Sequence, residues 1–155
     1  MDNPNPIFNI LEKIPLFKDL TEESYNLITN NITLEYYPKH HKIFSEGDPG
    51  DALYIIKRGV VRIYQGSDEN PDDQVEIATL SNDTFFGEMA LVSEKPRNAN
   101  AMVEEEAEIF VLKKDEFKNL INENPSLAEQ VSSEFIQRIK ENDRNQDFQE
   151  PTENL

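Results

Sequence analysis

The sequence predicts a mainly β protein with flanking helices, built as an antiparallel jelly roll (a double-stranded β-helix). The middle of the chain is a series of short runs rich in β-branched and aromatic residues, which favour strands. Segments rich in Gly, Pro, Asn and Asp separate these runs and are typical of turns. Both ends of the chain instead have apolar residues at helical spacing. Because many short strands between turns are typical of sandwiches and barrels, we expect about eight strands in one roll.

Two short helices are expected before the first strand. The first covers residues 7–13, and the second runs from Thr21 to about residue 31. Asp19 and Thr21 are both suited to cap the second helix, because their side-chain oxygens accept hydrogen bonds from unpaired backbone N–H groups. Two glutamates follow Thr21 directly and favour the positive end of that helix.

The predicted strands occupy the middle of the chain, where turn residues separate them. Arg58-Gly59 predicts a tight reversal between two strands, and residues 66–73 predict a polar, acidic hairpin tip. Asn82 and Asp83 tolerate left-handed backbone and fit a second turn. The expected strands, apart from one that ends at Phe85-Phe86, are 33–37, 42–44, 53–57, 60–65, 74–80, 100–105 and 107–113.

The end of the chain is expected to be helical again. One helix covers residues 114–124, and Pro125 then suits the first position of a second helix with Asn124 as its cap. Residues 141–155 are polar and are expected to form a frayed tail. Residues 1–140 therefore form one domain. The second helix has one apolar stripe, which consists of Leu127, Val131, Phe135 and Ile139.

Composition narrows the classes of function. The 155 residues include 31 acidic and 15 basic side chains, for a net charge of −16. Such a charge repels phosphate backbones and anionic membrane surfaces, so nucleic-acid and membrane binding are not expected. No apolar run is long enough to span a bilayer, and the first residues lack the basic and apolar regions of a signal peptide. We therefore expect a soluble, cytoplasmic protein.

Catalytic and metal chemistry find little support in the sequence. The absence of cysteine excludes disulfides, thiolate catalysis and cysteine-ligated metals. His40 and His41 are the only histidines and are expected in a surface turn before the strand at 42–44. No serine triad, P-loop or dinucleotide-binding glycine pattern is present. We expect no catalytic residues, no metal and no catalytic cofactor.

The stretch FGEMALVSEKPRNANA, at residues 86–101, carries the clearest chemical signal. Gly87 removes a side chain where a ligand or another backbone must come close. Glu88 then begins a short helical turn, whose unpaired N–H groups favour an anion. A guanidinium such as that of Arg97 binds phosphate through two parallel hydrogen bonds, whereas Glu88 can only accept, which suits sugar hydroxyls. A ribose phosphate fits both. The alternative is a surface salt bridge between Glu88 and Arg97.

The same stretch resembles the phosphate-binding cassette of the cyclic nucleotide-binding domains. That family is shared by protein kinase A regulatory subunits, cyclic nucleotide-gated channels and the bacterial catabolite activator. Its pattern, roughly F-G-E-[LIM]-A-L followed by P-R-x-A, is matched by residues 86–91 and 96–99. Residues 14–23, 43–64 and 77–88 also resemble the family, so the likeness covers about residues 7 to 140.

The resemblance implies roles for the cassette residues. Glu88 accepts from the ribose 2′-OH and Arg97 pairs with the cyclic phosphate. Asn98 departs from the family, which often has Ala, Ser or Thr there, with a hydroxyl associated with guanine contacts. Asn100 also departs, because Thr or Ser is common at its position. The remaining pocket residues, partly through their backbone N–H groups, are Gly87, Met89, Ala90, Leu91 and Ala99.

These observations predict a stand-alone receptor for a cyclic nucleotide, cAMP in preference to cGMP. Ligand binding is expected to move the C-terminal helices, with Phe135, Arg138, Ile139 or Phe148 as candidates to cover the base. The movement is read by a separate effector protein, and the negative charge favours a basic one. Two alternatives remain open. One is a degenerate domain that binds proteins without nucleotide, and the other is a small cupin-like enzyme on the same roll.

Overall fold

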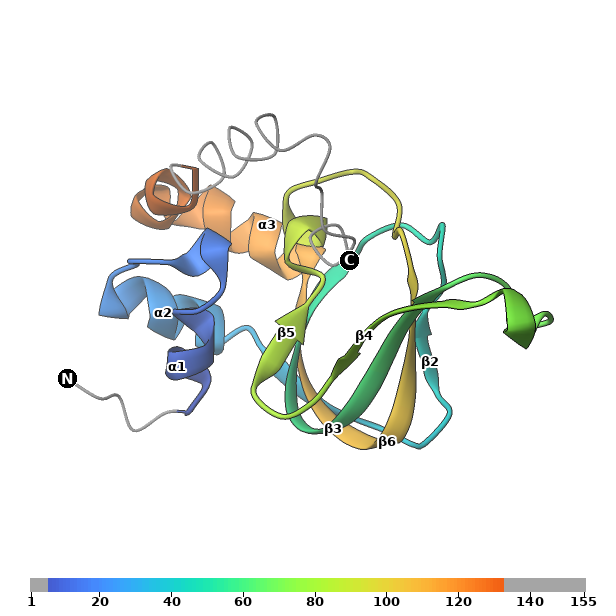
Figure 1. Cartoon of the computed structure of the whole chain (residues 1–155). Helices are drawn as coiled ribbons and strands as arrows, with labels where there is room; N and C mark the ends of the chain where they lie inside the picture. The colour runs from blue at the N-terminus through green and yellow to red at the C-terminus, as the bar shows by residue number, and fades with distance from the viewer. Residues whose placement is uncertain (1–5, 133–155) are drawn as a thin grey trace.

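The structure is a computed structural model that describes residues 6–132 of the chain. Helices gather at one end of a β-roll, and the chain crosses from helices to strands and back to helices (Figure 1). A further helix begins at residue 125 and continues to residue 132. The other helices and 3₁₀ turns are α1 (Pro6–Leu11), η1 (Pro15–Phe17), α2 (Glu22–Thr29), η2 (Pro71–Asp73), η3 (Glu88–Leu91) and α3 (Lys114–Glu123).

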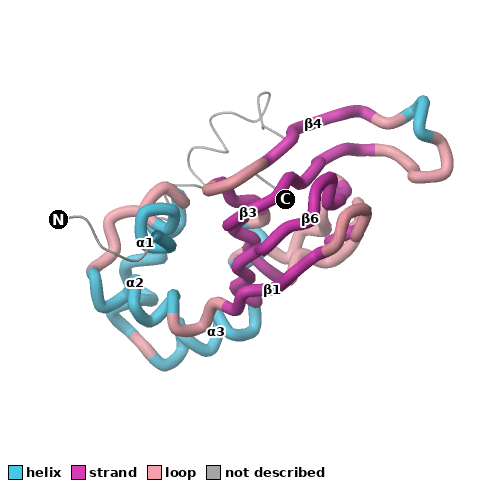
Figure 2. Tube along the Cα trace, turned by 90° about the horizontal axis from the view of Figure 1, so that it is seen from below, coloured by secondary structure: helices cyan, strands magenta, loops and turns pink. Residues whose placement is uncertain are grey.

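Six antiparallel strands make the roll within residues 6–132. The sheet has the order β1-β6-β3-β4, with β2 paired to β6 and β5 paired to β3. The β3–β4 hairpin projects away from the helices, as Figure 2 shows. The mainly β, jelly-roll-like class is therefore as predicted. The strands are β1 (Thr33–Tyr37), β2 (Lys42–Phe44), β3 (Ala52–Gln65), β4 (Val75–Leu80), β5 (Thr84–Phe86) and β6 (Asn100–Lys113).

The predicted reversal at Arg58-Gly59 is wrong, because β3 runs continuously through it. Arg58 pairs with Glu108 and Val60 with Glu105, so two residues of β6 lie opposite Gly59. This is a β-bulge, which bends a strand without reversing it. Gly59 itself has a φ of +119°, a backbone conformation that favours glycine. The strands predicted at 53–57 and 60–65 are thus one, as are those at 100–105 and 107–113.

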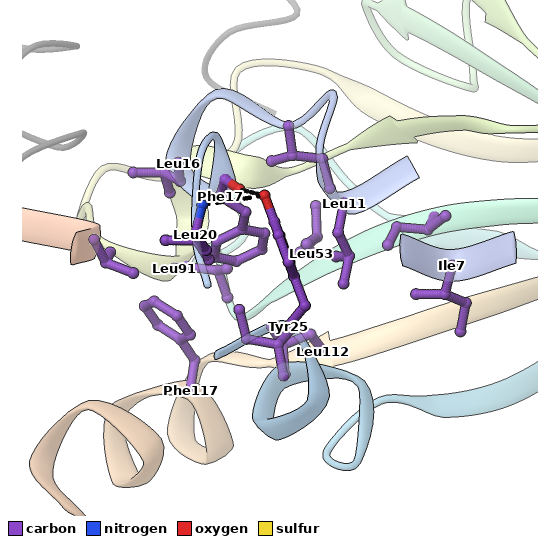
Figure 3. Close-up of a cluster of buried hydrophobic side chains, with 14 of the residues drawn as sticks. Ile7, Leu11, Leu16, Phe17, Leu20, Tyr25, Leu53, Leu91, Leu112 and Phe117 are labelled. Atoms are coloured by element: carbon purple, nitrogen blue, oxygen red, sulfur yellow. Dashed lines mark hydrogen bonds between the residues drawn. The ribbon is translucent and has the colours of Figure 1, made fainter. Parts of the chain in front are cut away.

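Two apolar cores share the long strands β3 and β6. Leu53 and Ile55 face a helical core built mainly from the N-terminal segment and α3, which Figure 3 shows. Tyr54 and Ile56, which alternate with them, face the roll core instead. Alternation is expected, because successive side chains of a strand point to opposite faces. The helices are therefore packed directly against the outer face of the strands that form the roll.

Local sequence features explain where the helices begin. The Thr21 side chain accepts a hydrogen bond from the backbone N–H of Ser24, so Thr21 is the cap of α2. Asp19 does not cap it and has a left-handed φ of +58°. Asn124 precedes the helix at residue 125 as predicted, but its side chain donates to the Leu120 carbonyl at the end of α3. Of the predicted apolar stripe, Leu127 and Val131 are buried.

Several sequence predictions lie outside the described residues. These are the second half of the stripe, the candidate lid side chains and the polar tail, namely Phe135, Arg138, Ile139 and residues 141–155. Within residues 6–132, no helix is long and apolar enough to cross a membrane.

Candidate functional site

Arg97 is held by backbone hydrogen bonds to the loop between β2 and β3. The Arg97 N–H donates to the Asp48 carbonyl at 2.7 Å, and the Gly47 N–H donates to the Arg97 carbonyl at 2.8 Å. Pro49 and Pro96 form an isolated bridge beside these bonds. A Cβ atom at Gly50 would lie 2.8 Å from the Ala90 Cβ, so the same loop also approaches η3 closely. The loop thus fixes the backbone of the predicted cassette at both ends.

The Arg97 side chain is buried beneath aromatic rings. Arg97 is 2% exposed, and its Cζ lies 4.2 Å from the centre of the Phe44 ring and 5.8 Å from that of Tyr54. Such contacts with aromatic faces stabilise a cation. Its Nη2 donates to the Ala52 carbonyl at 2.9 Å and lies 3.6 Å from a carboxylate oxygen of the exposed Asp51. The hydrogen bond to Ala52 and the ion pair with Asp51 therefore both use Nη2.

Within residues 6–132, the buried Nε and Nη1 of Arg97 have no hydrogen-bond acceptor. Burial lowers the pKa of Arg97 below its ordinary value, and the Asp51 carboxylate opposes that change. Arginine nevertheless remains charged at neutral pH. A buried cation with two unused N–H groups is costly unless an anion binds it.

Glu88 is also buried, at 6% exposure. Gly87, before it, has a left-handed φ of +85° that places the chain into the 3₁₀ turn η3. Both Glu88 and Arg97 lie below the surface, so the alternative of a surface salt bridge between them is wrong. The ion pair that Arg97 makes within the described residues is with Asp51.

Most of the other predicted cassette residues are buried, and one of them packs into the helical core. Met89, Ala90 and Ala99 are buried. The Ala90 N–H donates to the Gly87 carbonyl at 3.1 Å. The Leu91 side chain belongs to the helical core (Figure 3), so only its backbone is available to a ligand.

Asn98 and Asn100 have different surroundings. Asn98 is half-buried, and its backbone carbonyl accepts from the Gln65 side chain at 2.8 Å. Asn100 is buried, and its side chain accepts from the Glu46 N–H and donates to the carbonyls of Tyr64 and Gly66. A Thr or Ser hydroxyl could not make all three bonds at once with the same reach. Asn100 therefore ties the β2–β3 loop to the end of β3.

Sequence reasoning missed the aromatic support of Arg97. Phe44, Tyr54 and Phe86 come from three strands, and their ring centres lie 5.0 to 5.9 Å apart. Burial, together with the Asp51 carboxylate, raises the pKa of Tyr54 to about 12, so the ring stays neutral. Only strand register brings these rings together. The only hint in the sequence was that each of these aromatic residues lies at a strand position expected to face the core.

Lys114 connects the site to the C-terminal helices. Its backbone N–H donates to the Asp51 carbonyl at 2.8 Å. Its buried Nζ donates to the Ser93 carbonyl at 2.8 Å and to the Glu94 carboxylate at 2.9 Å. The first residue of α3 thus contacts both the loop beside Arg97 and the segment that follows η3.

The two histidines are surface residues. His40 and His41 are exposed in the turn between β1 and β2, and His41 packs beside the Tyr37 ring. Within residues 6–132, no group of three or more His, Cys, Asp or Glu side chains is arranged to hold a metal ion.

Comparison with known proteins places this geometry in a family. The sequence model described as "Cyclic nucleotide-binding domain" matches residues 34–124. The chain is 34% identical over 122 residues to cGMP-dependent protein kinase, isozyme 1, of Drosophila melanogaster, covering 78% of this chain and 16% of the kinase. It is 32% identical over 132 residues to the Cyclic AMP receptor protein of Thermus thermophilus, covering 83% of this chain and 59% of the receptor.

Solved structures agree with the sequence comparison. The Thermus thermophilus Catabolite Activator Protein matches with a TM-score of 0.63 and 31% identity, covering 86% of this chain and 62% of that one. The N-terminal domain of a Streptomyces coelicolor transcriptional regulator shares the fold with a TM-score of 0.76 at 24% identity, covering 87% of this chain and 93% of that one. The family matched is a binding domain rather than a catalytic one. The chain therefore belongs to the cyclic nucleotide-binding domain family.

Proposed function

We propose that this protein is a cyclic nucleotide receptor in which Arg97 pairs with the cyclic phosphate. The observation that carries the proposal is the buried Arg97 guanidinium, whose Nε and Nη1 have no acceptor within residues 6–132. Both belong to a planar cation whose N–H groups pair with the oxygens of a phosphate. The contacts with Phe44, Ala52 and Asp51 hold the guanidinium in place before the ligand arrives. Such preorganisation reduces the cost of binding.

Calorimetric titration with cAMP, cGMP and adenosine tests this function. Adenosine lacks the phosphate, so we expect heat from the cyclic nucleotides and little from adenosine. If neither cyclic nucleotide releases heat or raises the melting temperature, the receptor proposal fails. The alternative of an interaction module without nucleotide would then stand.

Glu88 is proposed to accept a hydrogen bond from the ribose 2′-OH. A buried carboxylate near a bound sugar would form a charge-assisted bond, worth about 1.5–3 kcal/mol. Replacing Glu88 with Gln should therefore weaken cAMP binding by roughly tenfold or more. With 2′-deoxy-cAMP, wild type and variant should bind alike. Equal losses with both ligands would remove Glu88 from this role, and the exposed Glu105→Gln serves as the control.

We propose that the receptor prefers cAMP to cGMP, since Asn98 stands where the family's guanine-associated hydroxyl would be. Asn98→Thr restores that hydroxyl at a half-buried position. The ratio of the cAMP and cGMP dissociation constants, measured by calorimetry, should shift toward cGMP in this variant. A ratio unchanged by the substitution, while both ligands still bind, would show that residue 98 does not read the base.

We propose that ligand binding changes the arrangement of the C-terminal helices and that an effector protein recognises this change. Lys114 contacts Asp51 and the residues after η3, so a shift at the phosphate site also acts on the start of α3. A cavity of about 320 Å³ lies between Leu91, Phe117 and Val131, where these helices meet the cassette. This space would allow the C-terminal helices to repack against the cassette. A ligand shifts such an equilibrium only by binding one arrangement more tightly.

A further inference from the structure

The edge strand β1 carries an exposed apolar pair. Leu34 is 50% exposed and Tyr36 is 59% exposed, and they are two of the three large hydrophobic side chains that are exposed within residues 6–132. They lie two positions apart, so both project from the same face of the strand. The third, Val75, is at the start of β4. Two neighbouring apolar side chains on one strand face form a surface that a partner can cover.

Within residues 6–132, no strand pairs with the outer side of β1. In the described part of the chain, β1 pairs only with β6, from Thr33 opposite Val111 to Tyr37 opposite Ala107. Figure 2 shows β1 at the margin of the strands beside β6. In an antiparallel pair, alternate residues direct their N–H and C=O groups away from the partner. Such an edge is a template for an added strand.

Negative charges surround this edge on both faces. Glu35, between the apolar residues, points to the opposite face and accepts from the Tyr37 hydroxyl at 2.6 Å. Glu106 accepts from the Tyr36 hydroxyl at 2.7 Å. Both donors are neutral hydroxyls, so neither bond brings a positive charge to this edge. Glu108, in contrast, is paired with Lys57 and Arg58.

A second copy of the chain fits this edge poorly. Antiparallel pairing of two β1 strands about their centres would set Glu35 directly opposite Glu35, and like charges opposite each other destabilise a sheet. Two chains of net charge −16 also repel each other. A strand with a basic side chain at that position has the complementary charge.

We propose that β1 (Thr33–Tyr37) is a docking edge for an extended basic segment of a partner protein. The segment adds a strand beside β1, with apolar side chains over Leu34 and Tyr36. Its alternate side chains are lysine or arginine and face Glu35. This surface is separate from Arg97 and does not depend on nucleotide binding, so the two proposals fail independently.

The test uses blocked seven-residue peptides and NMR of the full chain. The probe alternates valine and lysine, and one control alternates valine and glutamate. A second control keeps valine and lysine but carries N-methyl groups that prevent ladder hydrogen bonds. We expect the first peptide alone to shift and protect the amides of residues 33–37, and the binding to weaken as salt rises.

Variants separate specific docking from general attraction. The Glu35→Lys variant should no longer bind the valine–lysine peptide and should bind the valine–glutamate peptide instead. The double substitution Leu34→Ser and Tyr36→Ser should weaken binding by roughly fivefold or more, whereas Val75→Ser should leave it unchanged. Equal binding of the N-methylated peptide, or shifts centred on the acidic hairpin tip, would overturn the proposal. So would dimerisation of the free chain that Leu34→Ser abolishes, because the occupant would then be a second copy.

Discussion

Replacing Arg97 with methionine should abolish cyclic nucleotide binding without destabilising the fold. Loss of a buried charge-assisted pair typically costs about 2–5 kcal/mol of binding, which is roughly thirtyfold to several-thousandfold in the dissociation constant. The unliganded protein should be at least as stable as wild type, because a buried cation with two unused N–H groups is replaced by an apolar side chain that needs no hydrogen bonds. Methionine also packs well against aromatic rings such as Phe44.

Calorimetry with cAMP and urea unfolding of the same samples check the two halves of this prediction. Arg58→Met is the matched control, since Arg58 lies exposed on the outer surface of the roll beside Glu108. This variant should change neither the affinity for cAMP nor the urea midpoint of unfolding appreciably. If Arg97→Met keeps the wild-type affinity, Arg97 does not contact the phosphate. If it unfolds, Arg97 is a structural residue whose contact with Ala52 outweighs its desolvation.

Gly59→Ala should be among the most destabilising single substitutions in the chain. A Cβ at this position would lie 2.6 Å from the Cα of Ala107 and 2.7 Å from the carbonyl oxygen of Glu106, both backbone atoms of the opposite strand. The φ of +119° adds backbone strain for any residue with a side chain. Together we expect a loss of about 3 kcal/mol or more in the free energy of unfolding.

Gly47→Ala separates the two causes. Gly47 also has a left-handed φ, of +92°, but a Cβ there would meet nothing within 4 Å. Backbone strain should therefore be its only cost, which lowers the free energy of unfolding by about 1–2 kcal/mol. Urea unfolding with linear extrapolation measures both variants. Similar losses at the two positions would contradict the close approach of β3 and β6 at the bulge.

The sequence was most informative where a local rule decides the structure. The strands at 33–37 and 42–44 have the predicted bounds, because alternation and flanking turn residues act within a few positions. Of Asn82 and Asp83, which were both expected to tolerate left-handed backbone, Asp83 has it, with a φ of +66°. The family was identified correctly from the cassette pattern. These features need no knowledge of distant parts of the chain.

The errors and omissions concern contacts between distant strands. Arg58-Gly59 looks like a turn locally, but pairing of β3 with β6 on both sides of it makes a bulge. The rings around Arg97 are separated from it by more than forty positions along the chain, as Tyr54 and Phe44 show. Register, which sequence alone does not give, decides each case.

The sharing of β3 and β6 between two cores has a consequence for how the molecule holds together. Neighbouring residues, such as Leu53 and Tyr54, support the helical core and the roll core respectively. Neither core can loosen without disturbing strands that the other requires. The helices and the roll therefore form one cooperative unit, and a fragment that contains only one of them would lose half the support of its longest strands.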